Sequence, residues 1–78
     1  MWKEENNSLN REFKFKNFID AFAFMTRVAF VAEKMNHHPN WKNVYNTVSI
    51  SLNTHDVGNI VTDKDRRLAA EIDKLISS

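Results

Sequence analysis

The spacing of hydrophobic residues changes twice between Leu9 and Thr54 of this 78-residue chain, and those changes are the strongest constraint on its fold. From Leu9 to Phe15, apolar and polar residues largely alternate, which is typical of a half-buried strand. Between Phe18 and Met35 the apolar residues recur instead at helical spacing. The alternation of a strand returns between Trp41 and Thr54. A strand, a helix and another strand in so short a chain predict a sheet and a helix that share one core.

The alternating segments predict an antiparallel sheet. Trp2 to Glu5 is expected to form a short strand, followed by a turn at Asn6-Asn7-Ser8 and the strand from Leu9 to Phe15. The segment from Trp41 to Thr54 is predicted to be one long strand, with a short extra strand or a bulge near Asn46 as the alternative. The sheet should therefore contain three to four strands.

The central apolar segment predicts a helix with signals at both ends. Asn17 is a suitable N-cap. Pro39 disfavours helical geometry at the residue before it, so the helix should end near Asn36 or His37. Its buried stripe is expected to be Phe18, Phe22, Met25, Ala29 and Ala32. Because further apolar residues widen this surface, we expect the sheet to cover one side and a partner helix or subunit to cover another.

A second helix is predicted near the C-terminal end. The segment from Asn53 to Asn59 contains the single glycine and is expected to be a loop. Thr62 should cap the helix, and Asp65 follows three residues later, close to a capping box. The buried stripe is expected to be Leu68, Ala69, Ile72, Leu75 and Ile76. The predicted fold class is α+β, a small antiparallel sheet of three to four strands with helices packed on one face.

Composition excludes several classes of protein. The absence of cysteine removes disulfides and four-cysteine metal sites, so a domain this small is expected to rely on an aromatic core or on oligomerisation. The formal net charge is +1, with no basic stripe of the kind that binds nucleic acid directly. No apolar run approaches the roughly 20 residues of a membrane span, and the N-terminal residues do not resemble a signal peptide. We therefore expect a cytoplasmic protein with neither nucleic-acid nor membrane binding.

All three histidines lie where predicted elements end. His37 and His38 follow the central helix, and His55 follows the predicted long strand. An unperturbed imidazole has a pKa of roughly 6.5, so histidine exchanges protons near neutral pH. Glu33 precedes His37 by four residues, which places both on one helical face, where the carboxylate could hold the ring. Together these residues suggest a proton-transfer site.

Two other interpretations of the histidines stay open at this point. A His-His-Pro sequence at a helix end can simply be a C-terminal cap. Three histidines and an acid could also bind zinc. The adjacent pair His37 and His38 lacks the spacing of four residues that directs two helical rings at one ion, so we expect no metal site.

Several longer segments carry a resemblance to a known family. They are Arg-Glu-Phe-Lys-Phe at 11–15, Ala-Glu-Lys-Met-Asn-His-His-Pro-Asn-Trp at 32–41, Asn-Val-Tyr-Asn at 43–46 and Thr-His-Asp-Val-Gly at 54–58. The chain resembles pterin-4a-carbinolamine dehydratase, a family also known as a dimerisation cofactor of a homeodomain transcription factor. The family's ordered pattern is matched by Glu33, His37, His38, Pro39, Tyr45, His55 and Asp65.

The resemblance implies a lyase. Members of the family dehydrate 4a-hydroxytetrahydropterin to quinonoid dihydropterin and so recycle the pterin cofactor of aromatic amino-acid hydroxylases. By resemblance, the catalytic residues are His37, His38 and His55, while Glu33 and Asp65 orient imidazoles or bind the pterin. Trp41 and Thr54 are weaker candidates for pocket walls. The expected partners are the pterin substrate and further copies of the chain in a homodimer or homotetramer, and no cofactor or metal is implied.

The chain departs from the family's pattern in two places. Members usually begin with another helix, so we expect residues 1–78 to form a single domain that lacks this N-terminal helix. One extra residue lies between His55 and Asp65, which makes Asp63 an alternative to Asp65. A non-catalytic, oligomerising interaction module on the same fold is the alternative function.

Overall fold

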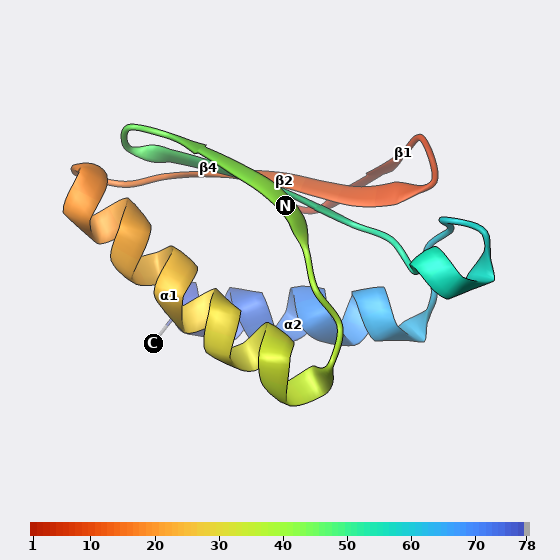
Figure 1. Ribbon diagram of the computed structural model, residues 1–78. Coiled ribbons are helices and arrows are strands. Elements are labelled where there is room, and N and C mark those ends of the chain that lie inside the picture. The colour runs from red at the N-terminus through yellow and green to blue at the C-terminus, as the bar shows by residue number, and fades with distance from the viewer. Residues whose placement is uncertain (78) are drawn as a thin grey trace.

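The computed structural model describes residues 1–77 as one four-stranded antiparallel sheet with two α-helices on one of its faces (Figure 1). The strand order is β1-β2-β4-β3. This arrangement confirms the predicted α+β class. In chain order the elements are β1 (Lys3–Glu5), β2 (Ser8–Lys14), α1 (Phe18–Met35), β3 (Asn40–Val44), β4 (Thr47–Leu52), the short 3₁₀-helix η1 (His55–Val57) and α2 (Asp63–Ser77).

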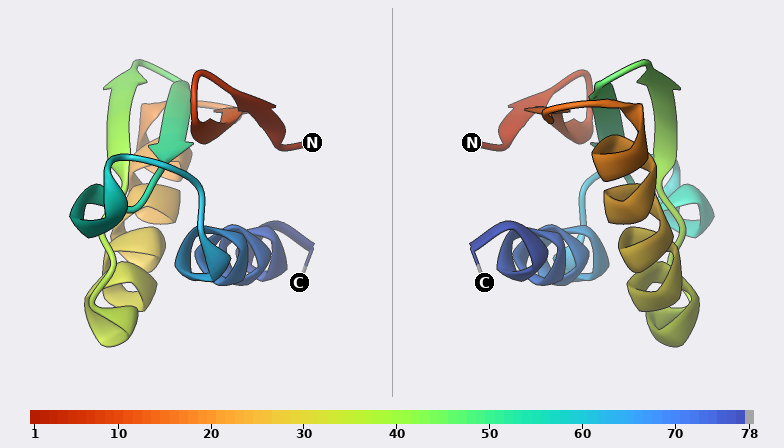
Figure 2. Two further views of the ribbon diagram at one scale, coloured as in Figure 1. Left: turned by 90° about the vertical axis from the view of Figure 1, so that its right-hand side faces the viewer. Right: turned by 90° about the vertical axis from the view of Figure 1, so that its left-hand side faces the viewer.

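The core lies between the two central strands and the helices. Strands β2 and β4 pair with Leu9 opposite Leu52 and Phe13 opposite Val48, and all four side chains are buried. Both helices lie on this side of the sheet (Figure 2). The other side of the sheet carries polar residues. From α2, the predicted stripe residues Leu68, Ala69 and Ile72 are buried, while the predicted Ile76 is largely exposed.

The prediction of one long strand from Trp41 to Thr54 is wrong. The segment forms the hairpin β3–β4, which turns at Tyr45 and Asn46, so the alternative of an extra strand near Asn46 is confirmed. Tyr45 has a φ of 52°, and the Asn43 side chain donates hydrogen bonds to the carbonyls of Tyr45 and Thr47 across the turn. The alternation of a strand continues through a two-residue turn, which is why the pattern alone did not show it.

Of the predicted buried stripe of α1, Ala32 is buried and Met25 is partly buried, but Phe18, Phe22 and Ala29 are exposed. The buried residues are Ala21, Phe24, Val28 and Ala32, whereas Phe18 and Phe22 are 44% and 54% exposed. A helix that is apolar around most of its circumference offers several stripes with the same periodicity. The small side chains of Ala21 and Ala32 face the core, and Phe24 packs its ring 4.9 Å from those of Phe13 and Phe15.

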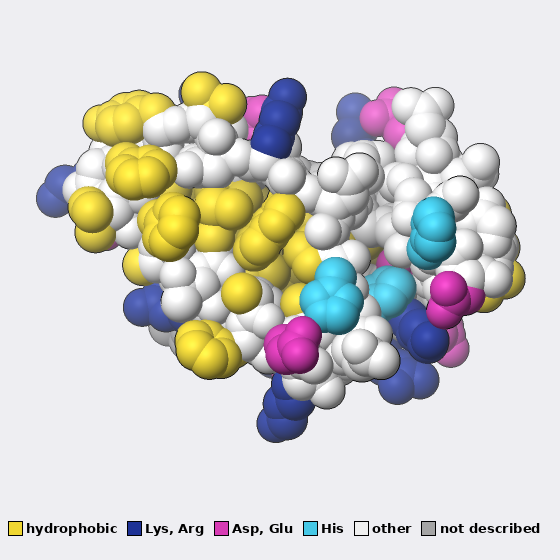
Figure 3. Space-filling view, in the orientation of Figure 1, with side chains coloured by type: hydrophobic (Ala, Val, Ile, Leu, Met, Phe, Trp, Pro, Cys, Tyr) yellow, Lys and Arg dark blue, Asp and Glu magenta, His cyan; other side chains and the backbone are white. Residues whose placement is uncertain are grey.

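The opposite side of α1 exposes large apolar side chains. In Figure 3 hydrophobic side chains cover much of the left of the molecule, over α1 and the β3–β4 hairpin. We call this exposed side of α1 the α1 apolar surface; its residues are Phe18, Ile19, Phe22 and Phe30. Among residues 1–77, no helix is both long enough and apolar enough to cross a membrane.

Helix α1 ends where the sequence predicts, in a Schellman motif. Asn36 takes the left-handed conformation, with a φ of 52°. Its N–H donates to the carbonyl of Glu33, and the N–H of His37 donates to that of Ala32. This reversal directs His37 back toward α2 and leads the chain into Pro39 and β3.

Candidate active site

A cleft of about 210 Å³ lies between the C-terminal end of α1 and the loop that joins β4 to α2. All three histidines line it, and the histidine side chains gather on one face of the molecule in Figure 3. The complete set of lining residues is Asn36, His37, His38, Asn53, Thr54, His55, Asp56 and Lys64. Elements distant in sequence therefore bring these imidazoles to one place.

His37 is anchored by a buried carboxylate. Its Nε2 lies 2.5 Å from Oδ1 of Asp65, a residue with no exposed surface. Because a carboxylate only accepts hydrogen bonds, Nε2 carries the proton. The other ring nitrogen, Nδ1, is then left for chemistry in the cleft.

Asp65 is held in turn by Thr54 and Thr62. The Thr54 hydroxyl and the Thr62 N–H each donate to Asp65 Oδ2 over 2.8 Å. The hydroxyl oxygens of Thr62 and Thr54 are 2.5 Å apart, and since Thr54 donates to Asp65, Thr62 donates to Thr54. The Thr62 N–H bond is one half of the predicted capping box, but the Thr62 hydroxyl serves this network instead of the helix end.

Two opposing effects act on the pKa of Asp65. Burial raises it, while the hydrogen bonds from His37, the Thr62 backbone and Thr54, together with the charge of a protonated His37, lower it, and the net direction is downward from 3.8. The carboxylate is therefore ionised at neutral pH and can balance positive charge on His37.

His38 pairs with Glu33 on the exposed rim. Its Nε2 lies 2.9 Å from Oε1 of Glu33, and both side chains are mostly exposed. The prediction that Glu33 holds His37 is therefore wrong. The helical spacing on which it rested ends at Met35, and the left-handed Asn36 turns His37 inward and leaves His38 beside Glu33.

His55 has a neutral partner. It begins η1, and its Nδ1 lies 2.7 Å from Oδ1 of Asn59. Both residues are exposed, and His55 faces the cleft from the side opposite α1.

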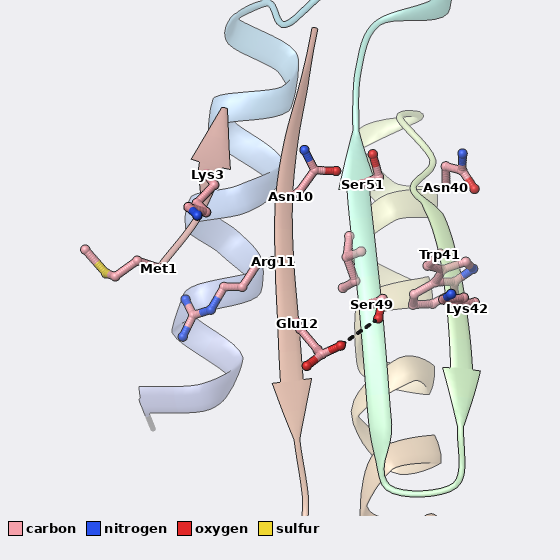
Figure 4. A pocket seen from close by; sticks show the side chains of 11 residues that line it. Met1, Lys3, Asn10, Arg11, Glu12, Asn40, Trp41, Lys42, Ser49 and Ser51 are labelled. Carbon is pink, nitrogen blue, oxygen red and sulfur yellow. Dashed lines mark hydrogen bonds between the residues drawn. The ribbon is translucent and has the colours of Figure 1, made fainter. Parts of the chain in front are cut away.

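The pocket-wall candidate Trp41 and the pattern residue Tyr45 lie away from the cleft. Trp41 is opposite Ile50 in the register of β3 and β4 and packs at the edge of the core. It borders a separate hollow of about 420 Å³ on the sheet, together with polar residues such as Ser49 and Asn10 (Figure 4). Tyr45 lies in the β3–β4 turn and does not line the cleft.

Of the two aspartates proposed, the cleft network uses Asp65. Asp63 is exposed at the first turn of α2. In the loop before Asp65, the Thr54 N–H bonds to the carbonyl of Ile60 and closes the segment between them.

Sequence reasoning missed several residues of the cleft and its support. Thr62 was assigned only to helix capping, and Asn59 only to a loop. The four-residue step from His55 to Asn59 was a usable signal, because a side chain at that spacing can return to the ring. Nothing in the pattern distinguished the lining residues Asn36, Asn53, Asp56 and Lys64.

The ring nitrogens do not converge on a common point. His37 and His38 turn their Nε2 atoms to different carboxylates, Asp65 and Glu33. Within residues 1–77, no group of three or more histidine, aspartate or glutamate side chains has an arrangement that could hold a metal ion. What the cleft offers chemically is a set of imidazoles in fixed orientations, which suits general acid–base catalysis.

A small α+β domain with an imidazole-lined cleft defines a class of proteins equipped for proton transfer. Comparison with known families gives the particular one. The chain belongs to the pterin 4 alpha carbinolamine dehydratase family, whose sequence model matches residues 1–75. This confirms the family expected from the sequence.

Individual relatives agree with this assignment. A curated protein of Prochlorococcus marinus (strain MIT 9312), named "Putative pterin-4-alpha-carbinolamine dehydratase", is 57% identical over 74 residues, which cover 95% of this chain and 76% of the relative. A protein of the same name from Synechococcus sp. (strain WH7803) is 58% identical over 74 residues, which cover 95% of this chain and 78% of the relative.

Two solved structures share the fold. A transcriptional coactivator/pterin dehydratase from Brucella Melitensis has a TM-score of 0.88 and 41% identity, over 94% of this chain and 79% of that one. A pterin dehydratase-like protein, identified as a RuBisCO assembly factor in the alpha-carboxysome, has a TM-score of 0.78 and 25% identity, over 100% of this chain and 89% of that one.

Proposed function

We propose that this protein is a hydro-lyase that dehydrates pterin-4a-carbinolamine to quinonoid dihydropterin. In this reaction the C4a–O bond breaks, and the hydroxyl takes up a proton and leaves as water. The neighbouring ring nitrogen loses a proton and forms a double bond to C4a. The reaction would recycle the pterin cofactor of aromatic amino-acid hydroxylases, and we propose that it takes place in the cytoplasm.

The observation that carries this proposal is the meeting of all three histidines at one cleft. The reaction needs one group that gives a proton and one that takes a proton, and positioned imidazoles near neutral pH do both. His37 has the strongest support, because the ionised Asp65 behind it can balance the charge that forms when its ring takes up a proton. Acid–base catalysis of this kind contributes about 10²–10⁴-fold to a rate.

An assay of carbinolamine dehydration tests the proposal. We expect His37→Ala and His38→Ala each to lower kcat/KM by about 10²-fold or more, because each removes a cleft imidazole. Lys42→Ala, on the polar side of the sheet, is the control and should keep the parent rate. Absence of activity in the folded parent chain would refute the enzymatic function.

An interaction module is the second candidate function, and the α1 apolar surface favours it. Part of this surface forms a shallow hollow of about 340 Å³, bordered by Phe18, Ile19, Phe22 and Ala23. Large apolar areas on a small domain commonly mark protein contacts. We propose that the α1 apolar surface holds copies of this chain together in a homodimer or homotetramer, a role compatible with catalysis in the cleft.

Assembly can be tested separately from activity. Phe22→Glu places a charge in the middle of the α1 apolar surface and should shift the protein to monomers in sedimentation analysis. Val57→Glu is a matched control, because Val57 is equally exposed but lies on η1. If the parent protein is a monomer, or if Phe22→Glu assembles as the parent does, this surface does not hold copies together.

A further inference from the structure

We propose that Asn59 is a positioning residue that sets which nitrogen of His55 carries the proton. The inference rests on the proposed function for its catalytic meaning, but its geometry stands by itself. Oδ1 of Asn59 lies 2.7 Å from Nδ1 of His55. An amide oxygen only accepts, so Nδ1 donates its proton, and in the neutral ring Nε2 keeps its lone pair.

The backbone keeps Asn59 in place for this contact. Its φ of 59° is in the left-handed region, which asparagine tolerates better than most residues, and it follows Gly58 at 82°. The N–H of Asn59 donates to the carbonyl of Thr54 over 3.1 Å, and the N–H of Thr54 donates to the carbonyl of Ile60 over 2.8 Å. Because Thr54 is buried and bonded to Asp65, the loop that carries His55 is attached to the same network that anchors His37.

The three imidazoles therefore differ in what holds them. His37 and His38 each turn Nε2 to a carboxylate, Asp65 and Glu33. His55 turns Nδ1 to a neutral amide. A carboxylate can balance a positive ring, whereas an amide oxygen fixes the orientation of a ring without adding charge.

This difference assigns the two proton transfers of the proposed reaction to different histidines. His55 presents an unprotonated Nε2, which suits it to accept the proton of the pterin ring nitrogen. The proton that leaves with the hydroxyl then comes from the histidines that face carboxylates. One proton is given and one is taken, so the total charge of the cleft does not change, and each ring returns to its starting protonation state once a proton passes between the rings.

Nitrogen chemical shifts of the histidine rings test the contact directly. In the parent chain we expect neutral His55 to be mainly the Nδ1–H tautomer. In Asn59→Gly, which keeps a left-handed backbone but removes the acceptor, we expect it to shift toward the Nε2–H tautomer that free histidine prefers. Asn7→Gly is the matched control, because Asn7 is also an exposed asparagine with positive φ, at 61°, in the β1–β2 turn.

Kinetics then test whether the tautomer matters. We expect Asn59→Gly to lower kcat about fivefold, the equivalent of one modest hydrogen bond, with little change in KM. Asn59→Asp should keep the Nδ1–H tautomer and most of the rate, while the acid limb of its pH–rate profile moves to higher pH because a carboxylate stabilises the protonated ring.

Several results would overturn the proposal. One is an Nε2–H tautomer at His55 in the parent chain. Another is a loss of rate in Asn59→Gly with the tautomer unchanged, and a third is an altered tautomer with an unchanged rate. If the parent chain does not dehydrate the carbinolamine at all, the proposed function fails, but the ring shifts still decide whether Asn59 controls His55.

Discussion

At the scale of single residues, Asp65 connects the cleft to the core of the protein. Its two oxygens accept hydrogen bonds from His37, Thr54 and Thr62, while its side chain has no contact with solvent. A buried carboxylate is tolerated only when such bonds replace its hydration. Asp65 therefore contributes both to the orientation of His37 and to the stability of the fold.

The catalytic part of this role predicts the effect of Asp65→Asn. The amide keeps the shape of the side chain but cannot balance a positive His37, so we expect kcat to fall by about 10²-fold. The measurement is the steady-state dehydration rate at pH 7. Asp63→Asn is the matched control, since Asp63 is exposed in the same turn of α2. Equal rates for parent and Asp65→Asn would show that Asp65 has no part in catalysis.

The stability part predicts a dependence on pH. The pKa of Asp65 is lower in the folded protein than its ordinary value of 3.8, so the ionised carboxylate stabilises the fold above that value. This stabilisation is lost as the pH falls from about 4 through the folded pKa. Urea unfolding of the parent at a series of pH values from 7 to 3, at one protein concentration, should reveal this loss.

In Asp65→Asn the corresponding part of the pH dependence should be absent, while Asp63→Asn should follow the parent curve. Identical slopes below pH 4 for all three proteins would contradict the role assigned to the Asp65 carboxylate.

At the scale of elements, the end of α1 decides where the histidine pair points. The Schellman motif requires a left-handed residue at Asn36, a conformation that costs most side chains about 1–2 kcal/mol. We therefore expect Asn36→Ala to lower the melting temperature by about 4–8 °C, as a loss of about 1 kcal/mol does in a domain of this size.

The matched variant at this position is Asn36→Gly, which removes the same side chain but accepts the left-handed backbone. Its melting temperature should stay close to that of the parent. If both variants melt together, the backbone conformation is not the reason for asparagine at this position.

The elements also show how much of the fold could be predicted from the sequence. Strands β1 and β2, the caps of α1 and the two helices followed from local spacing, whereas the hairpin β3–β4 was predicted as one strand. The family pattern indicated the three histidines. The phase of α1 did not follow, because Phe18 and Ala21 lie on different apolar stripes that local spacing weighs equally. Only the close packing of the sheet and α2 selects the stripe of Ala21, Phe24 and Val28, which shares Ala32 with the predicted one.

The sequence predicted which residues form the candidate site better than it predicted which of them contact each other. Helical spacing predicts a contact between Glu33 and His37. Because Asn36 is left-handed, Glu33 contacts His38 instead. Asn59 and Thr62 act through a loop whose course depends on the pairing of Thr54 with Ile60. Such contacts depend on where the backbone reverses direction. These reversals leave a weaker signal in the sequence than the periodic spacing of buried residues in helices and strands.

At the scale of the whole molecule, Asp73 joins the first two strands to the last helix. Its Oδ1 accepts hydrogen bonds from Trp2 Nε1 and Arg11 Nη1, both over 2.8 Å. The Arg11 guanidinium also lies 4.6 Å from the centre of the Phe13 ring, at the edge of the core. These contacts explain an arginine on the apolar side of β2, and they link β2 and Trp2, the residue before β1, to α2.

We expect Asp73→Ala to lower the free energy of unfolding by about 1–2 kcal/mol, a value reduced for the partial exposure of the pair. The control is Glu71→Ala, which removes the exposed pair with Lys74 in the same helix and should cost no more than about 0.5 kcal/mol. Urea unfolding of both variants measures the difference, and equal losses would show that Asp73 is an ordinary surface residue.

The strand order also has a consequence for how quickly the protein folds. The central pair, β2 and β4, is separated in the chain by all of α1 and β3, and even its nearest residues, Lys14 and Thr47, must meet across that distance. Closing so long a loop costs chain entropy before any contact repays it, and proteins with such distant pairings fold more slowly than those built from neighbouring elements. His37 and His38 lie within this loop, whereas His55 and Asp65 follow β4. Because the cleft joins these two parts of the chain, it should be among the last parts of the molecule to form.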